Sequence, residues 1–151
     1  MDFRLRPAEP SDLEFIWHLR VATMRHMIEE AYGWDEATER AYAAESLGGM
    51  IVLVGEKPVG VVTLADWGDQ LHVVWMAIAS EVQGRGLGRA LVESCQRQAQ
   101  QARKPLTLQV LQGNPAVAMY AVGVRGLRAQ RSAQAADALA ILAVAGRVIV
   151  S

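Results

Sequence analysis

The spacing of apolar residues in the first third of the chain predicts helices. A short strand with alternating character over residues 3–6 is followed by a proline-containing loop. Apolar residues then recur at helical spacing, at Leu13, Ile16, Trp17, Val21 and Met24. Ser11 and Glu14 predict a capping box at the start of this helix. We expect a second helical piece over residues 24–32 and a further helix over residues 34–44.

The middle of the chain changes to the period of β-strands. Residues 50–54 and 59–64 read as a hairpin around a Gly-Glu-Lys-Pro turn, and residues 70–78 as a third strand. Both faces of this third strand are largely apolar, so we expect a central strand covered on both sides. A helix over residues 86–102 and a strand over residues 106–111 follow. The expected buried stripe of that helix comprises Leu87, Ala90, Leu91, Ser94, Cys95 and Gln98.

The last part of the chain has a less regular pattern. An alanine-rich stretch predicts a helix over about residues 132–145, and residues 146–150 predict a terminal strand. No clear sixth and seventh strand stands out here. The order of strand, helices, three-strand meander, helix and strand is typical of an α/β (α+β) domain with an open sheet. We expect residues 1–151 to form a single domain with an atypical C-terminus.

Composition and charge narrow the class of protein. The 151 residues suit one domain, and an apolar content of 52% is enough to fill one core. A net charge of −1 gives no reason to expect a nucleic acid or a membrane as a partner. The single cysteine, Cys95, cannot form an intrachain disulfide, and residues 1–6 lack the apolar stretch of a signal peptide. We therefore expect a cytoplasmic protein.

A glycine-rich turn, Gln83 to Gly88, joins the third strand of the meander to the following helix. A helix N-terminus carries unpaired amides and the positive end of the helix dipole. Glycines at alternate positions let the backbone turn tightly and approach a ligand closely. Arg85 and Arg89 add positive charge. The pattern predicts a site for a pyrophosphate.

Two other phosphate-binding turns do not fit this segment. A P-loop needs Lys followed by Ser or Thr, whereas Gly88 is followed by Arg89 and Ala90. A dinucleotide fingerprint has the spacing G-x-G-x-x-G and an acid at the end of the next strand, whereas that strand is followed by Gln112. The remaining alternative is a turn that only connects strand to helix.

The turn and its surroundings resemble the GNAT-type N-acetyltransferases. Gln83 to Gly88 resembles the family's acetyl-CoA signature, Gln/Arg-x-x-Gly-x-Gly/Ala, which follows the fourth strand. Residues 106–111 and then Asn114 to Tyr120 resemble the fifth strand and the helix after it. Arg4 to Asp12 resembles the family's first strand and the entry to its first helix. The resemblance covers about residues 3–120.

The resemblance implies a fold and a reaction. The fold is the GNAT-like acyl-CoA N-acyltransferase fold, a mixed, mostly antiparallel sheet flanked by helices. The cosubstrate is acetyl-CoA, no metal is needed, and a neutral amine attacks the thioester directly. Tyr120 is the implied catalytic residue, which protonates the departing thiolate. The implied cofactor-binding residues are Met76, Ala77, Ile78, Gln83, Gly84, Arg85, Gly86, Leu87, Gly88, Arg89 and Asn114.

Several side chains have plainer interpretations beside the functional ones. Tyr120 could instead place its ring in the core with its hydroxyl at the edge. Cys95 lies on the buried stripe and reads as core rather than nucleophile. A general base is not evident, since His72 reads as a satisfied strand histidine and Glu81 as a solvated loop acid, so water could serve. The aromatic residues between positions 26 and 42 could line the acceptor pocket or pack in the core; they are Tyr32, Trp34 and Tyr42.

After Tyr120 the sequence departs from the family, which continues with Leu-Gly-Phe and a two-stranded hairpin. Our hypothesis is a reading-frame shift, because codons for Val122-Gly123-Val124 can spell Leu-Gly-Phe when read one base on. Resequencing the gene tests it: a gene in which no frame encodes Leu-Gly-Phe followed by two strands would rule it out. The alternative is that the tail supplies a helix and strand of its own.

Three functions remain open on the sequence. The first is transfer of an acetyl group to a primary amine of a small molecule or peptide. The second is a non-catalytic acyl-CoA-binding or regulatory module on the same fold, and the third is a nucleotide-binding protein of another class. The acceptor amine is not identified by the sequence, and a homodimer is open because members of the family often pair.

Overall fold

The computed structural model describes residues 2–111, 128–131 and 139–144. The chain divides into two compact units. The first combines Met1–Thr63 with Trp75–Leu87, and the second combines Leu64–Val74 with Gly88–Ser151. Each unit therefore consists of two segments that are separated in the sequence.

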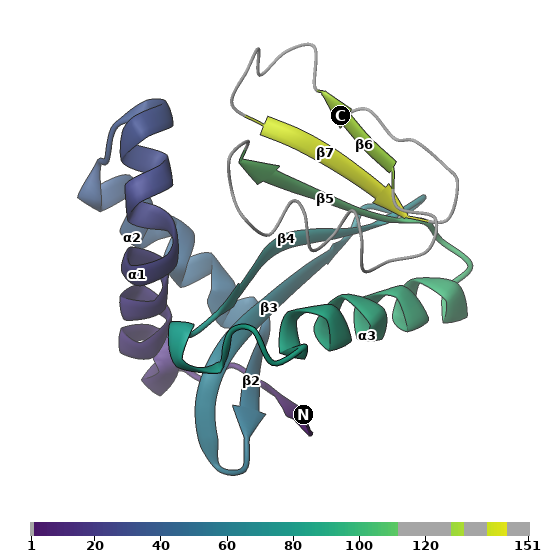
Figure 1. Cartoon of the computed structure of the whole chain (residues 1–151), viewed down its shortest axis with the longest axis horizontal. Helices are drawn as coiled ribbons and strands as arrows, with labels where there is room; N and C mark the ends of the chain where they lie inside the picture. The colour runs from purple at the N-terminus through teal and green to yellow at the C-terminus, as the bar shows by residue number, and fades with distance from the viewer. Residues whose placement is uncertain (1, 112–127, 132–138, 145–151) are drawn as a thin grey trace. The chain divides into compact units, whose positions relative to one another are not determined.

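The elements follow one another as strand, helices, meander, helix and strands (Figure 1). The α-helices are α1 (Leu13–Tyr32), α2 (Glu36–Glu45) and α3 (Leu87–Gln101). The short 3₁₀ turns are η1 (Pro10–Asp12), η2 (Ser46–Gly48) and η3 (Ser80–Val82). The strands are β1 (Arg4–Pro7), β2 (Met50–Val54), β3 (Lys57–Asp66), β4 (Leu71–Ile78), β5 (Leu106–Leu111), β6 (Arg128–Arg131) and β7 (Leu139–Val144).

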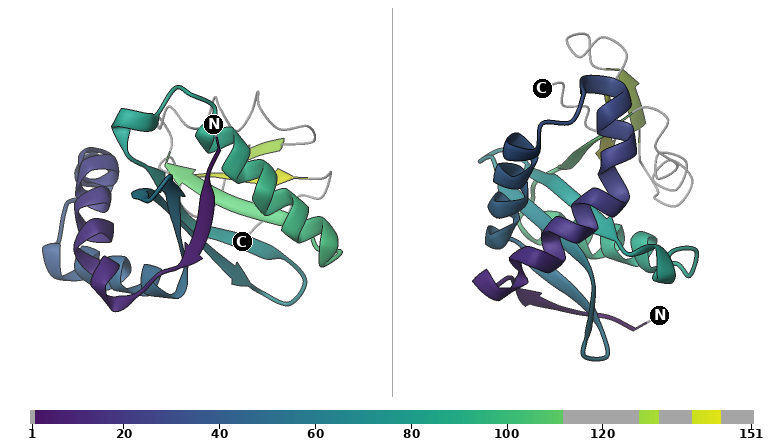
Figure 2. Two further views of the ribbon diagram at one scale, coloured as in Figure 1. Left: turned by 90° about the horizontal axis from the view of Figure 1, so that it is seen from below. Right: turned by 90° about the vertical axis from the view of Figure 1, so that its left-hand side faces the viewer.

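The strands form a mixed, mostly antiparallel sheet in the order β1-β2-β3-β4-β5-β7-β6. The β1–β2 and β2–β3 pairs are antiparallel, and β2 and β3 form the long hairpin seen in Figure 2. The parallel β4–β5 pair joins Leu71–Val73 to Leu106–Leu108. On the other edge of β5, β7 pairs antiparallel over six residue pairs. The expected fold class, with β4 as a central strand, is confirmed.

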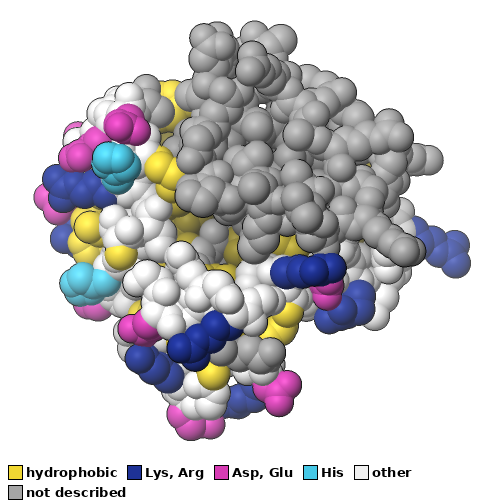
Figure 3. Space-filling view, viewed as in Figure 1, with side chains coloured by type: hydrophobic (Ala, Val, Ile, Leu, Met, Phe, Trp, Pro, Cys, Tyr) yellow, Lys and Arg dark blue, Asp and Glu magenta, His cyan; other side chains and the backbone are white. Residues whose placement is uncertain are grey.

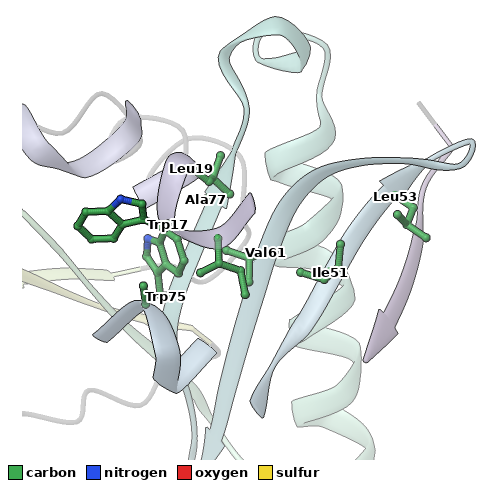
Figure 4. Packing of buried hydrophobic residues seen from close by; sticks show 9 residues of the cluster. Trp17, Leu19, Ile51, Leu53, Val61, Trp75 and Ala77 are labelled. Atoms are coloured by element: carbon green, nitrogen blue, oxygen red, sulfur yellow. The ribbon is translucent and has the colours of Figure 1, made fainter. Parts of the chain in front are cut away.

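The core of the first unit lies between α1, α2 and one face of the sheet. Its members are buried apolar side chains that contact one another, several of which are drawn in Figure 4. They are Ile16, Trp17, Leu19, Ala43, Ile51, Leu53, Val61, Trp75 and Ala77. Burial of a large apolar side chain contributes about 1.5–3 kcal/mol. Apolar residues at helical spacing on α1 and at alternate positions on β4 therefore pack together in one cluster.

Arginines cover the aromatic side chains that join α1 to α2. The rings of Trp17 and Trp34 lie 6.0 Å apart at a tilt of 44°. The Arg40 guanidinium lies 4.2 Å from the centre of the Trp17 ring, and that of Arg25 lies 5.3 Å from the Trp34 ring. These distances are within the range of cation–π attraction. Both arginines also pair with glutamates one helical turn away, and Figure 3 shows basic and acidic side chains interspersed over the described surface.

The start of α1 differs from the expected capping box. Ser11 lies inside η1, and the carboxylate that closes the turn is that of Asp12. Asp12 accepts a hydrogen bond of 2.7 Å from the Glu9 amide and receives both terminal nitrogens of Arg6, at 2.7 and 2.8 Å. The predicted box of Ser11 and Glu14 is wrong, because the capping box forms two residues earlier, between Glu9 and Asp12 at the start of η1. The helix that follows is one continuous helix rather than two pieces.

Burial along β4 and α3 corrects two further expectations. The β4 face with Val73, Trp75 and Ala77 is buried, but on the other face Val74 is 47% exposed, so the strand is not covered on both sides along its length. On α3 the buried side chains include Val92 and Ala99, whereas Gln98 is exposed. The buried stripe is thus rotated by about one residue from the predicted one, around Leu87, Leu91 and Cys95.

The tail contains strands where a helix was expected. The predicted helix over residues 132–145 is wrong at Leu139–Val144, which forms β7 and pairs with β5. Arg128–Arg131 forms β6 on the other side of β7. Alanine favours helices only weakly, by less than 1 kcal/mol per residue, and the backbone hydrogen bonds offered by β5 outweigh that preference. The predicted terminal strand over residues 146–150 lies outside the described residues.

We expect Asp12→Asn to lower the free energy of unfolding near neutral pH by about 1–2 kcal/mol, because Arg6 loses its charged partner. The hydrogen bond from Arg6 holds the pKa of the Asp12 carboxyl below its ordinary 3.8. A lowered folded pKa means that this stability is present above the ordinary pKa and is lost as pH falls through the folded pKa. Urea unfolding at about pH 7 and about pH 2 measures the difference, which should shrink at low pH.

Glu56→Gln is the matched control, because it removes the exposed Arg4–Glu56 pair. We expect this change to be within about 0.5 kcal/mol of the wild type at both pH values. An Asp12→Asn deficit that is equal at both pH values would contradict the assigned role of the Arg6 pair.

Candidate functional site

The connection from β4 to α3 depends on two glycines in the left-handed region of backbone space. Gly84 has a φ of +76° and Gly86 a φ of +83°. A β-carbon added at either position would meet no atom within 4 Å. The glycines are therefore required by backbone conformation rather than by space, since a side chain costs roughly 1–2 kcal/mol in this region.

Backbone amides gather at the start of α3. The amides of Val82 and Gln83 donate to Ala79 and Ser80 at 3.1 and 3.2 Å and close η3. No described group accepts a hydrogen bond from the amides of residues 84–86. The first amides of α3 have no partner within their own helix, and the dipole places positive potential there. This arrangement can bind an anion such as a phosphate.

Two side-chain bonds hold the turn in place. The Gln83 amide nitrogen donates to the carbonyl of Ile78 at 2.9 Å, so the side chain spans from the turn to the end of β4. Lys57, at the start of β3, pairs with Glu81 of η3 at 2.9 Å. The side-chain amide of Gln83, one of the predicted cofactor-binding residues, thus donates a hydrogen bond that stabilises the turn. Glu81 is exposed, as the sequence indicated, and carries this ion pair in addition.

The end of β4 is fixed from the β3 side. A bulge at Val59 interrupts the β2–β3 register, and the Val59 carbonyl accepts a 2.7 Å hydrogen bond from the Ala79 amide. At the next residue, Gly60, β3 approaches β4 so closely that an added β-carbon would lie 2.6 Å from the carbonyl oxygen of Ala77. The backbone of residues 77–79 therefore has a defined position.

The three predicted pantetheine-binding residues occupy the last part of β4. Ala77 is buried in the core of the first unit, whereas Met76 and Ile78 are partly buried. The ladder between β4 and β5 ends at Val73, five residues before the end of β4. These residues and the turn form one continuous stretch, from Met76 to Arg89.

Positive side chains flank the amides of the turn. Arg85 is exposed, and no acidic side chain in the described part of the chain pairs with it. Arg89 is exposed in the first turn of α3 and pairs with Glu93 at 3.3 Å. Leu87 and Gly88 are buried and anchor the helix start. Both arginines can move toward an anion held at the turn, because neither is buried.

Sequence reasoning missed a buried ion pair between α1 and α2. Arg20 donates a hydrogen bond of 2.9 Å from Nε to a carboxylate oxygen of Glu39, and its Nη2 lies 2.7 Å from the same oxygen in an ion pair whose side chains are both about nine-tenths buried. The Arg20 guanidinium also lies 5.4 Å from the ring centres of Tyr42 and Trp75. One signal was present: position 20 falls one turn after Ile16 on the stripe predicted to be buried.

Burial decides the roles of two titratable residues. Burial raises the pKa of the Cys95 thiol to about 11, so the side chain is a core residue and not a nucleophile, as expected. Burial also lowers the pKa of His72, whose Nδ1 is 2.7 Å from the Thr107 hydroxyl and whose ring stacks on Trp67 at 4.0 Å. It is the satisfied strand histidine that the sequence predicted.

The remaining predicted site residues divide into two groups. Asn114 and Tyr120 lie outside the described residues, so their roles stay predictions. Of the aromatics proposed for an acceptor pocket, Trp34 packs against the core, while Tyr32 and Tyr42 are 61% and 48% exposed. The core interpretation is thus confirmed for Trp34.

Comparison with known proteins identifies the fold. The model of the Acetyltransferase (GNAT) family matches residues 13–124. A PaiA N-acetyltransferase from Thermoplasma acidophilum, solved in complex with coenzyme A, superposes with a TM-score of 0.69 at 11% identity, over 93% of this chain and 98% of that one. Apo YjaB from Escherichia coli gives 0.73 at 20%, over 97% and 100%. The ribosomal-protein-S18-alanine N-acetyltransferase from Escherichia coli gives 0.68 at 20%, over 99% and 100%.

No curated protein sequence matches the chain. Among the described residues, no group of three or more His, Cys, Asp or Glu side chains is placed to hold a metal ion. None of the helices in the described part is both long and apolar enough to cross a bilayer.

Proposed function

We propose a function from one premise: the chain belongs to the acetyltransferase (GNAT) family, whose model matches residues 13–124. Membership indicates acyl transfer from an acyl-CoA in general. We take the donor to be acetyl-CoA and the acceptor to be a primary amine of a small molecule or peptide, in the cytoplasm. The whole of residues 1–151 then acts as one catalytic domain.

The observation that carries this proposal is the turn before α3. Two left-handed glycines lie in this turn, and the amides of residues 84–86 have no described acceptor, next to the positive end of a helix. Arg85 and Arg89 lie beside those amides on the surface. A coenzyme with a pyrophosphate and a further phosphate matches this set of donors and charges. Unpaired amides occur at any helix start, so it is their combination with two left-handed glycines and two exposed arginines that favours a phosphate site over a turn that only connects strand to helix.

The pantetheine arm would continue from the turn along β4. Its amide groups can hydrogen-bond to the backbone of Met76, Ala77 and Ile78 in the manner of an added strand. This part of β4 lies beyond the ladder with β5. Its end is held by two hydrogen bonds, from the Ala79 amide to the Val59 carbonyl and from the Gln83 side chain to the Ile78 carbonyl, which we call the Gln83 clasp. A rigid strand end that leads directly into the turn suits a ligand that must present its thioester at a fixed position.

Transfer of the acetyl group then requires correct positioning of the two substrates and two proton transfers. The attacking amine loses one proton, and the leaving thiolate gains one. The neutral amine attacks the thioester carbonyl, the C–N bond forms and the C–S bond breaks. The attacking nitrogen loses its proton to water, since we assign no side chain as a general base. Tyr120 would give its proton to the leaving thiolate, and Asn114 would bind near the thioester. Residues 84–89 hold the departing coenzyme throughout.

A non-catalytic acyl-CoA-binding module is the second candidate. It is favoured by one observation, that the match to the family ends at residue 124 and leaves residues 125–151 outside it. Such a module would bind coenzyme A at the same turn but would not release its thiol.

We expect Gly86→Val to weaken binding of coenzyme A at least about tenfold, which is ~1.4 kcal/mol, because valine is strained at this φ and would distort the amides. Isothermal titration of the purified protein with coenzyme A measures the Kd. Gly55→Val is the matched control: Gly55 has a φ of +63° with open space around it, but it lies in the β2–β3 turn. A loss of affinity that is equal in both variants would contradict the proposed role of the turn.

We expect the wild type to release thiol from acetyl-CoA in the presence of a suitable amine, and Tyr120→Phe to reduce kcat by about 10²–10³, because the thiolate leaves unprotonated. A thiol reagent gives the rate directly, since Cys95 is buried and its pKa is about 11, so it does not contribute. Glu56→Gln, at the exposed turn between β2 and β3, is the control. Binding of coenzyme A without thiol release from a panel of amines would favour the non-catalytic module.

A further inference from the structure

We infer that Arg20 is a positioning residue for the proposed reaction. Arg20 acts through Trp75 on the part of β4 that receives the acyl-CoA arm. This inference rests on the proposed function and adds a contribution from α1 to it. Neither Arg20 nor Glu39 belongs to the turn or to the strand segment assigned above.

Arg20 stands where an apolar side chain would be the simpler choice. It lies one helical turn after Ile16 and beside Leu19, both of which are in the core. Its side chain is 11% exposed and that of Glu39 is 7% exposed, so both charges have been taken almost entirely out of water. A buried ion pair is rarely better for stability than two apolar side chains of similar size. Packing alone therefore does not explain the pair.

The guanidinium contacts β4 through the ring of Trp75. The distance from the Arg20 guanidinium to the centre of the Trp75 ring is 5.4 Å, within the range of cation–π attraction. The Nε hydrogen bond and the ion-pair contact of Nη2, both to the same Glu39 oxygen, restrict the orientation of the guanidinium. The restrained guanidinium of Arg20 therefore lies in cation–π contact with the Trp75 indole.

Trp75 lacks another polar anchor. Its indole N–H is buried and has no hydrogen-bond partner among the described residues. The ring is therefore held by apolar packing, seen in Figure 4, and by Arg20. Apolar burial is non-directional, whereas the Arg20 cation adds an attraction with a preferred position relative to the ring.

The position of Trp75 matters because it directly precedes the proposed arm-binding residues 76–78. The far end of this segment is held by the Ala79–Val59 hydrogen bond and the Gln83 clasp. The near end has the Trp75 ring and, through it, Arg20. Hydrogen bonds of an added strand weaken steeply with misalignment, so a small shift at Trp75 would lower affinity for the arm.

The test replaces the pair in a way that keeps the core apolar. In the double variant Arg20→Met with Glu39→Leu, no unpaired charge is left buried, so we expect the Tm to stay within a few degrees of wild type. We expect the Kd for coenzyme A, measured by titration calorimetry well below the Tm, to rise about tenfold. An unchanged Kd in the folded double variant would overturn the inference.

A matched control is available on the same helix pair. Arg40 and Glu36 also form an ion pair, and Arg40 also covers a tryptophan, but that ring is Trp17 of α1 and not a residue of β4. The double variant Arg40→Met with Glu36→Leu makes the same change in charge and should leave the Kd for coenzyme A unchanged. An equal rise in both double variants would assign the effect to general loosening and overturn the inference.

Arg20→Lys keeps the test decisive if the first double variant does not fold. Lysine retains a charge for Glu39 but loses the plane that lies over Trp75, so we expect a several-fold rise in Kd with little change in Tm. A Kd equal to wild type would overturn the inference. No binding heat from the wild type would instead refute the proposed function, whereas wild-type binding with unaltered variants refutes only the role of Arg20.

Discussion

A single backbone constraint supports the proposed site: the chain must turn from the end of β4 into α3 within residues 79–86 and leave amides unspent. Two left-handed glycines make this turn possible, and η3 uses the amides that come before it. Two further contacts hold the shape of the turn: the hydrogen bond from the Gln83 side chain to the Ile78 carbonyl and the Lys57–Glu81 ion pair. If the turn relaxed, the cationic side chains would remain, but they would have no fixed set of donors to support.

Much of the fold follows from local pattern. The strands over residues 50–54 and 106–111 were predicted to the residue, because a short apolar run bounded by glycine or proline has few other interpretations. The glycine turn was found because its residues act through their own backbone. The single helix α1 was read as two pieces although no breaker separates them, which reflects a change in apolar spacing around residue 24 and no physical interruption.

What the sequence did not reveal depends on contacts between distant segments. Arg20 shows only a charge on an apolar stripe, and its meaning appears when α2 brings Glu39 and β4 brings Trp75 to it. The alanine-rich tail has a local preference for helix, but β5 offers an open edge that extended chain can pair with. The roles of Asn114 and Tyr120 rest on the family resemblance alone. Local propensity fails where a partner from elsewhere in the chain decides the outcome.

The bulge at Val59 has a consequence for how the β2–β3 hairpin tolerates length changes. Because one residue of β3 is left over in the pairing with β2, the inward and outward sequence of side chains is reset at that point. Losing Val59 would make the ladder regular and leave Val61 paired with Ile51, but it would remove the carbonyl that accepts the hydrogen bond from the Ala79 amide. The hairpin, although far in sequence from the coenzyme turn, therefore helps to set the position of the end of β4.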